Sequence, residues 1–179
     1  MTENLDLVPA LTRPDLLADP VVKALTGFGA ADQVKVAAID PDLADTAAFC
    51  AHYGVGLEQS ANCVVLAGRR EGVELFAACM VLATTRADVN GLARKHLGVR
   101  KLSFASMDRA VEETGMQYGG ITPIGLPAEW PILVDRAVVE AGNVVIGSGI
   151  RGSKLWLPGE LLASLPGAVV LDGLGRVVE

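Results

Sequence analysis

Short apolar runs separated by charged or glycine-rich turns predict most of the strands of this chain. Val34–Ile39 is brief and rich in β-branched residues, which indicates a strand. Two longer apolar runs, Asn62–Ala67 and Val73–Ala83, flank the charged segment Gly68–Gly72, a pattern typical of a β-hairpin. Because both runs are almost continuously apolar, we expect them to pair as antiparallel strands in the central sheet, covered on both faces.

Helices are predicted where apolar residues recur at helical spacing before a glycine. Asp40 precedes Pro41 and Asp42, so a capped helix should begin there and continue through Ala44–Tyr53 to Gly54. Three further helices are expected at Val21–Leu25, at Asp88–Leu97 before Gly98, and at Ser106–Thr114 before Gly115.

The last third of the chain alternates short strands with turns. We expect strands at Ile132–Val138, with Asp135 in its middle, and at Val144–Ile146, Leu155–Leu157 and Ala168–Leu171, with a helix from Pro158 to Leu165. Hairpins and helices mix without a regular βαβ rhythm, so the predicted fold is mixed α/β (α+β), a mixed sheet with helices packed on it. Residues 31–179 are expected to form a single domain, with residues 1–30 as an arm laid on it.

Composition narrows this picture. The chain has 179 residues, of which 51% are hydrophobic and only 4% aromatic, so its core must consist mainly of aliphatic side chains. A net charge of −6 argues against broad, nonspecific binding to nucleic acid. A local basic rim is still compatible with the sequence, although solvated surface charge is the simpler interpretation. Its members would be Arg69, Arg70, Arg86, Arg94, Lys95, Arg100 and Lys101.

Metal and disulfide chemistry find little support. Cys50, Cys63 and Cys79 are odd in number and lack paired spacing, and His52 and His96 have no supporting pattern. We therefore expect buried, reduced thiols, no metal and no cofactor. The N-terminus lacks the order of a signal peptide, and no apolar run is long enough to span a bilayer, so a cytoplasmic protein is expected.

Two glycine-rich loops are the best candidates for a site. The first glycine loop, Gly119–Gly125, holds three glycines and Pro123 in seven residues. Glycines allow positive φ and close approach of a ligand to backbone N–H groups, which can stabilise an oxyanion, although a tight turn is the plain alternative. The second glycine loop, Gly147–Gly152, adds Arg151. Neither fits a phosphate-binding or dinucleotide-binding fingerprint.

The order of these motifs resembles the YbaK family of aminoacyl-tRNA deacylases, which includes the editing domain of bacterial prolyl-tRNA synthetases. Gly119–Gly125 is similar to the family loop Gly-Gly-Ile-Ser-Pro-Leu/Ile-Gly, with threonine for serine. Ile132–Asp135 resembles its strand ending in aspartate, and Ser148–Gly152 its Gly-Gly-x-Arg-Gly loop. Gly159–Leu162 and Asp88–Gly98 resemble two family helices, so the likeness covers roughly residues 55–170.

The resemblance implies a site without a side-chain nucleophile. In the family, the glycine loop orients the aminoacyl ester and a water through backbone groups. The implied catalytic residues are Gly119, Gly120 and Asn62. The implied substrate-binding residues, expected to converge with them on one cleft, are Thr122, Pro123, Asp135, Ser148, Gly149, Arg151 and Gly152.

One position departs from the family. Asn62 stands where the family has a lysine, and asparagine can form hydrogen bonds but supplies no charge. An active site would need a cation from elsewhere, with Arg151, Lys154 and Arg86 as candidates.

Two functions follow from the resemblance. The first is trans-editing hydrolysis of a mischarged aminoacyl-tRNA. The second is non-catalytic binding of an aminoacyl or other small ligand in the same cleft. A purely structural protein would instead bury the glycine loop. The sequence leaves the amino acid, the tRNA and the oligomeric state open.

Overall fold

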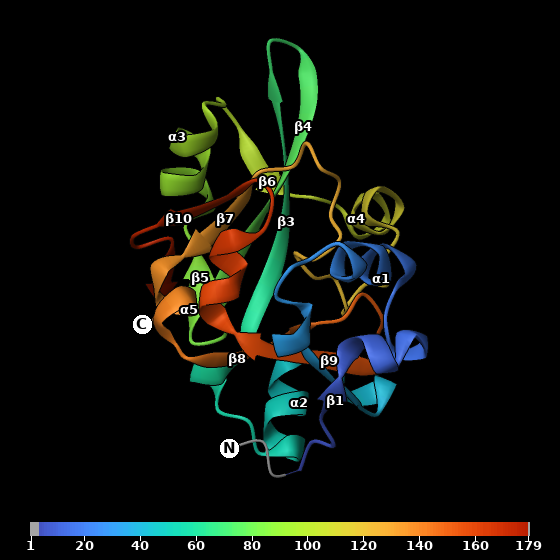
Figure 1. Cartoon of the computed structure of the whole chain (residues 1–179). Helices are drawn as coiled ribbons and strands as arrows, with labels where there is room; N and C mark the ends of the chain where they lie inside the picture. Colours follow the sequence, from blue (N-terminus) through green and yellow to red (C-terminus); the bar gives the residue numbers. More distant parts are fainter. Residues whose placement is uncertain (1–3, 179) are drawn as a thin grey trace.

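Two larger β-sheets and one small sheet organise the chain. The computed structural model describes residues 4–178 (Figure 1). One sheet has five strands in the order β10-β7-β4-β3-β6, a second has the order β1-β2-β9-β8, and a third pairs β11 with β5. The strands are β1 Val8–Pro9, β2 Lys35–Ala38, β3 Ala61–Arg70, β4 Val73–Leu82, β5 Thr85–Ala87, β6 Leu102–Phe104, β7 Ile132–Asp135, β8 Asn143–Gly147, β9 Ser153–Pro158, β10 Ala168–Leu171 and β11 Gly175–Val177.

The β3–β4 hairpin forms the centre of the five-stranded sheet and confirms the predicted antiparallel pair. Its register runs from Ala61 opposite Leu82 to Arg70 opposite Val73. Glu71 and Gly72 form the turn with φ values of 52° and 79°. Positive φ at both central positions matches the twist of the flanking strands. The strands therefore continue into the charged segment expected as a loop, and the hairpin tip projects beyond the rest of the protein (Figure 1).

The strand predicted at Ile132–Val138 is shorter than expected. β7 ends at Asp135, and Arg136–Glu140 forms helix α5. Asp135 stands at the N-cap position of α5, although its side chain makes no capping hydrogen bond to the helix. The apolar residues after Asp135 belong to the helix, and Val138 is fully buried.

Helix starts follow their capping residues. Asp40 caps only a short 3₁₀ turn, Pro41–Leu43, while Asp45 caps α2, Thr46–Tyr53, by accepting bonds from two backbone N–H groups. The predicted helix from Ala44 therefore begins at Thr46. The other α-helices are α1 Asp19–Thr26, α3 Arg94–Leu97, which follows a π-helical turn Val89–Ala93, and α4 Met107–Thr114. Further 3₁₀ turns include the segment Gly159–Ser164 expected as the last helix. Within residues 4–178 no helix is long and apolar enough to cross a membrane.

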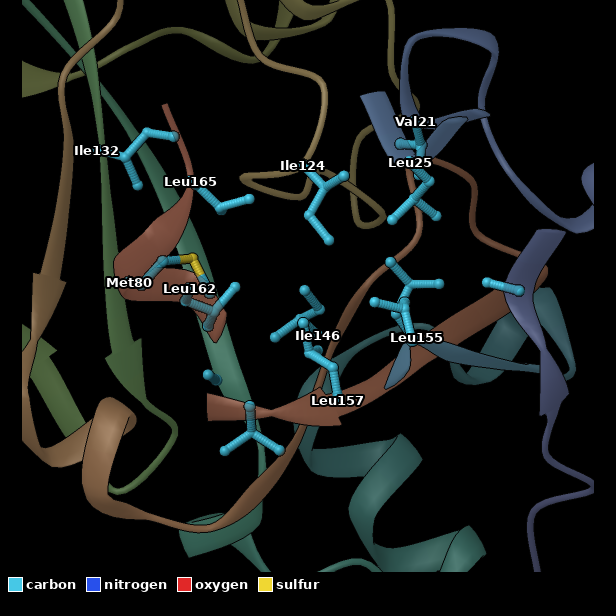
Figure 2. Packing of buried hydrophobic residues seen from close by; sticks show 14 of the residues in the cluster. Val21, Leu25, Met80, Ile124, Ile132, Ile146, Leu155, Leu157, Leu162 and Leu165 are labelled. Atoms are coloured by element: carbon cyan, nitrogen blue, oxygen red, sulfur yellow. The ribbon is translucent and has the colours of Figure 1, made fainter. Parts of the chain in front are cut away.

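The largest hydrophobic cluster lies between the two larger sheets and includes α1. Val21 and Leu25 of α1 have no exposed surface. They point toward Ile124 of the first glycine loop and Leu155 of β9 (Figure 2). The N-terminal segment also adds β1 to the edge of the four-stranded sheet. Its apolar side chains therefore form part of the core that supports both glycine loops.

This packing predicts different effects for two leucines of the N-terminal segment. Leu25→Ala should reduce the free energy of unfolding by about 2–5 kcal/mol, because it leaves a cavity among well-packed side chains. Leu11→Ala is the matched control, since Leu11 is 40% exposed and should change stability by less than about 1 kcal/mol. Urea denaturation measures both, and equal effects would contradict this account of the core.

Candidate functional site

A cleft of about 370 Å³ opens where the two larger sheets meet. Its walls come from the start of β3, the start of α2, the first glycine loop and the paired ends of β8 and β9. We call it the central cleft. The residues lining it are Ala44, Asp45, Thr46, Ser60, Ala61, Asn62, Cys63, Val64, Tyr118, Gly119, Ile121, Val145, Ile146, Gly147 and Lys154. Its volume suits a small organic ligand.

Asn62 lies on the wall of the central cleft, near the start of β3. Its side-chain oxygen accepts a hydrogen bond of 2.8 Å from the hydroxyl of Thr46. Thr46 is the first residue of α2 and is held there by the Asp45 cap. This bond fixes the Asn62 amide, so its NH₂ group remains as a donor for a ligand.

Lys154 places a buried ammonium on the wall of the central cleft. It lies on β9 with only 9% of its surface exposed, and its ammonium donates a 3.1 Å hydrogen bond to the carbonyl of Ala44. The ammonium also lies 5.4 Å from the centre of the Phe49 ring. Burial lowers the pKa of Lys154 below its usual value, while the charge of Asp45 opposes that change. One positive charge is thus held in a fixed position on the cleft wall.

The two glycine loops pack back to back. The N–H of Gly149 donates a 2.6 Å hydrogen bond to the carbonyl of Gly120. A Cβ on Gly120 would lie 2.5 Å from the carbonyl oxygen of Ile150, and one on Gly147 would lie 2.5 Å from the Gly120 oxygen. No larger residue fits at this approach of two backbones. Gly120 and Gly149 are therefore held by contacts between the loops.

The backbone donors of the first glycine loop are not equivalent. The N–H of Gly120 already donates to the carbonyl of Gln117 at 3.0 Å. Gly119 and Ile121, which flank it, both line the central cleft. Within residues 4–178 their N–H groups donate no hydrogen bond. They are the loop donors available to the carbonyl oxygen of a ligand.

Ser148, Arg151 and Gly152 hold the loops in place. The buried Ser148 hydroxyl exchanges hydrogen bonds with Ser153, and the guanidinium of Arg151 donates to the carbonyls of Tyr118 and Pro41. The carbonyl of Gly152 accepts from the N–H of Ile39. None of the three is among the residues that line the central cleft, and their bonds stabilise the loops beside it.

Thr122 and Pro123 face away from the central cleft. Thr122 is fully buried, and its hydroxyl finds no partner among residues 4–178. Pro123 lines a separate, mainly apolar pocket of about 200 Å³ against α1. The structure therefore divides the first glycine loop, with Gly119 and Ile121 on the cleft and the later residues in the core.

Asp135 is not brought to the central cleft. It lies at the end of β7, where its carboxylate approaches the backbone N–H groups of Leu174 and Gly175. Burial raises the pKa of Asp135, and those N–H groups oppose the rise. The expectation that Asp135 shares one cleft with both glycine loops is corrected, because this strand end is covered by the chain leading into β11.

Other candidates lack the surroundings that chemistry requires. Cys63 touches the cleft, but desolvation raises the pKa of its thiol far above the usual value, so it stays protonated. His52 and His96 are exposed, and no cluster of residues suited to a metal occurs within residues 4–178.

Sequence reasoning missed four polar residues of the cleft wall. Asp45 and Thr46 form the true start of α2, and the Asp-Thr pair just before an alanine-rich run was the available signal. Tyr118, which is 51% exposed, precedes the first glycine loop and offers an aromatic face at the cleft mouth. Ser60 had no signal, because it reaches the cleft only through a bridge to Val145.

Comparison with known proteins identifies the family. Residues 40–165 match the aminoacyl-tRNA editing domain family. The chain belongs to this family. The finding confirms the resemblance inferred from the glycine loops, and in this editing domain Asn62 and Lys154 both line the central cleft.

Solved structures share the fold of this editing domain. A candidate trans-editing enzyme for prolyl-tRNA synthetase superposes with a TM-score of 0.72 at 25% identity, covering 89% of this chain and 96% of that one. The hypothetical protein APE2540 gives 0.72 at 21% identity, over 87% of this chain and 96% of the other. A scaffold protein used for epitope grafting also gives 0.72, at 23% identity, over 90% and 97%. The mixed α/β fold class is thereby confirmed.

The back-to-back loops predict unequal effects for two glycines. Gly120→Ala should lower the free energy of unfolding by about 1–3 kcal/mol, because its Cβ would force two backbones apart. Gly152→Ala is the control, since its Cβ would meet only Pro41 Cγ at 3.8 Å, an ordinary contact. Thermal denaturation should show a lower Tm for the first variant only; a wild-type Tm for Gly120→Ala would disprove the close packing.

Proposed function

We propose that this editing domain hydrolyses the aminoacyl ester of a mischarged tRNA in trans. The observation that carries the proposal is the pairing, on one cleft, of a buried ammonium with two backbone N–H groups that have no partner in residues 4–178. Preorganised donors around a developing negative charge are what ester hydrolysis requires. Membership of the editing family supports a tRNA substrate, and with it a cytoplasmic site of action.

The proposed reaction needs no covalent intermediate. Water attacks the ester carbonyl carbon, and the N–H groups of Gly119 and Ile121 bind the oxygen as it becomes an oxyanion. The tetrahedral species then collapses, the bond to the ribose oxygen breaks, and that oxygen leaves with a proton derived from the water. The products are the free amino acid and the tRNA with its ribose hydroxyl restored.

Lys154 and Asn62 take separate parts in this scheme. The Lys154 ammonium stabilises the negative charge that develops on the substrate, because a fixed cation acts strongly in a partly desolvated cleft. Asn62, held by Thr46, orients the substrate by hydrogen bonding. The charge of the family lysine is thus supplied from the facing sheet.

Non-catalytic binding of an aminoacyl or other small ligand is the second candidate. It is favoured by the commitment of the Lys154 ammonium to the Ala44 carbonyl, since a cation already bonded stabilises a transition state less. A panel of mischarged tRNAs separates the two functions. Loss of the amino acid faster than spontaneous hydrolysis supports the enzyme, whereas unchanged loss across the whole panel supports the binder.

Replacing Lys154 with an uncharged residue should lower the activity without lowering the stability of the protein. Lys154→Met should lower kcat about 100-fold, while its Tm stays within about 2 °C of wild type or rises, because an apolar side chain of similar length avoids the cost of burying an ammonium. Lys35→Met is the control, as Lys35 is exposed and lies outside the cleft. If Lys154→Met deacylated tRNA at the wild-type rate, Lys154 would have no part in the mechanism.

The lowered pKa of Lys154 gives a pH test of the same role. Deacylation, corrected for spontaneous hydrolysis, should fall as the pH rises through this lowered pKa, because the cation is lost there. The unfolded chain binds more protons than the folded one between that value and the ordinary lysine pKa of about 10.4, so stability should rise with pH across the same interval. Lys154→Met should abolish both trends.

Asn62→Lys distinguishes a divergent hydrolase from a protein that has lost the activity. If the wild type is inert, restoring the family lysine should create measurable deacylation. If the wild type is active through Lys154, a second cation nearby should raise kcat less than about tenfold, because the charge is already supplied. Steady-state assays with the best substrate of the panel measure both, and Asn62→Gln controls for side-chain length.

A further inference from the structure

A second and larger cavity, of about 1230 Å³, lies between the β3–β4 hairpin and α3. We call it the hairpin groove. The residues lining it are Ala67, Gly68, Arg69, Arg70, Glu71, Gly72, Glu74, Asn90, Arg94, Gly98, Arg100, Lys101, Leu102 and Ser103. Figure 1 shows α3 beside the base of the projecting hairpin. The groove follows the outer part of β3, from Ala67 to Arg70.

The hairpin groove is a positive region on an acidic protein. Five of the 15 lysine and arginine residues line it, against two of the 21 acidic residues. One of those two, Glu74, forms an ion pair of 2.6 Å with Arg109 on α4 and is therefore partly neutralised from outside the groove. The remainder of the chain has ten basic and 19 acidic residues. Such a concentration of one sign attracts a polyanion locally while the rest of the surface repels it.

Two of the five basic side chains in the hairpin groove form hydrogen bonds within the described part of the protein, and the other three do not. The guanidinium of Arg70 donates to the carbonyl of Leu97, and that of Arg94 donates to the carbonyl of Asn90. Arg69, Arg100 and Lys101 are exposed, and their side chains bond to nothing within residues 4–178. A guanidinium presents paired N–H donors that match the oxygens of a phosphate. Free, clustered donors of this kind fit a chain of phosphates.

β3 connects the hairpin groove to the central cleft. Asn62 lines the cleft and Arg69 lines the groove, seven residues further along the same strand. At about 3.3 Å per residue the two positions lie about 23 Å apart. A stacked nucleic-acid strand advances about 3.4 Å per phosphate, so about seven nucleotides cover that distance. One RNA molecule can therefore have its aminoacylated end in the cleft and backbone phosphates in the groove.

We propose that the hairpin groove binds the phosphodiester backbone of the RNA whose aminoacylated end enters the central cleft. This inference rests on the proposed function for the identity of the RNA. The groove contributes affinity and position by charge, while the chemistry stays in the cleft. Phosphate contacts carry no sequence information, so the groove should accept tRNAs regardless of their amino acid.

Charge removal at the free donors tests the proposal. Arg100→Gln/Lys101→Gln should weaken binding of uncharged tRNA about tenfold at low salt, and should reduce the slope of log Kd against log salt concentration by about 1.5. Lys23→Gln/Lys35→Gln removes the same charge from exposed positions outside the groove and should leave the slope unchanged. Fluorescence anisotropy measures both, and an unchanged Tm verifies that the variants are folded.

A kinetic comparison keeps this inference separate from the proposed function. On aminoacyl-tRNA, Arg100→Gln/Lys101→Gln should raise KM about tenfold with kcat unchanged. On an aminoacyl ester of adenosine, which has no phosphodiester backbone, the variant should match wild type. A wild type that never deacylates but binds tRNA through the groove would defeat the proposed function and leave this inference standing. Equal tRNA affinity of both double variants, as expected if the groove binds an acidic protein segment, would overturn the inference.

Discussion

The backbone contact between the two glycine loops is the constraint on which the site depends. Gly120 and Gly147 bring two chain segments closer than any side chain would allow. That approach turns Gly119 and Ile121 toward one side and Thr122 toward the core, and it fixes the end of β8 beside the start of β3. The central cleft exists because two segments, in contact between Gly120 and Gly149, share a single tight interface. The glycines are needed for that geometry even where none of their atoms meets a ligand.

Burying Lys154 costs stability, and the structure offsets only part of that cost. One hydrogen bond to the Ala44 carbonyl and the face of Phe49 replace the water that surrounds an exposed ammonium. A leucine or methionine would satisfy the packing of β9 more simply. Retaining a charge there is consistent with a functional demand for a cation, as sites of this kind commonly trade stability for activity.

Most of the local structure followed from the sequence, because it depends on neighbouring residues. The hairpin, the glycine-ended helices and the fold class were predicted from apolar patterns and from Gly54, Gly98 and Gly115. Asp135 was misjudged because its cover by Leu174 and Gly175 depends on a distant chain segment. Lys154 was named as one of three possible cations. Its position on the cleft wall could not be predicted, because it depends on the pairing of β8 with β9 and on their approach to α2.

The folded domain includes α1, which lies outside the residues that match the family. Residues 40–165 carry the editing-domain match, yet Val21 and Leu25 cover Leu155, and the carbonyl of Pro20 packs against Gly125. Cutting the chain at residue 40 would uncover the apolar floor beneath the first glycine loop. The helix therefore supports the first glycine loop from a segment outside the family match, so the shape of the central cleft depends on residues that the family signature does not include.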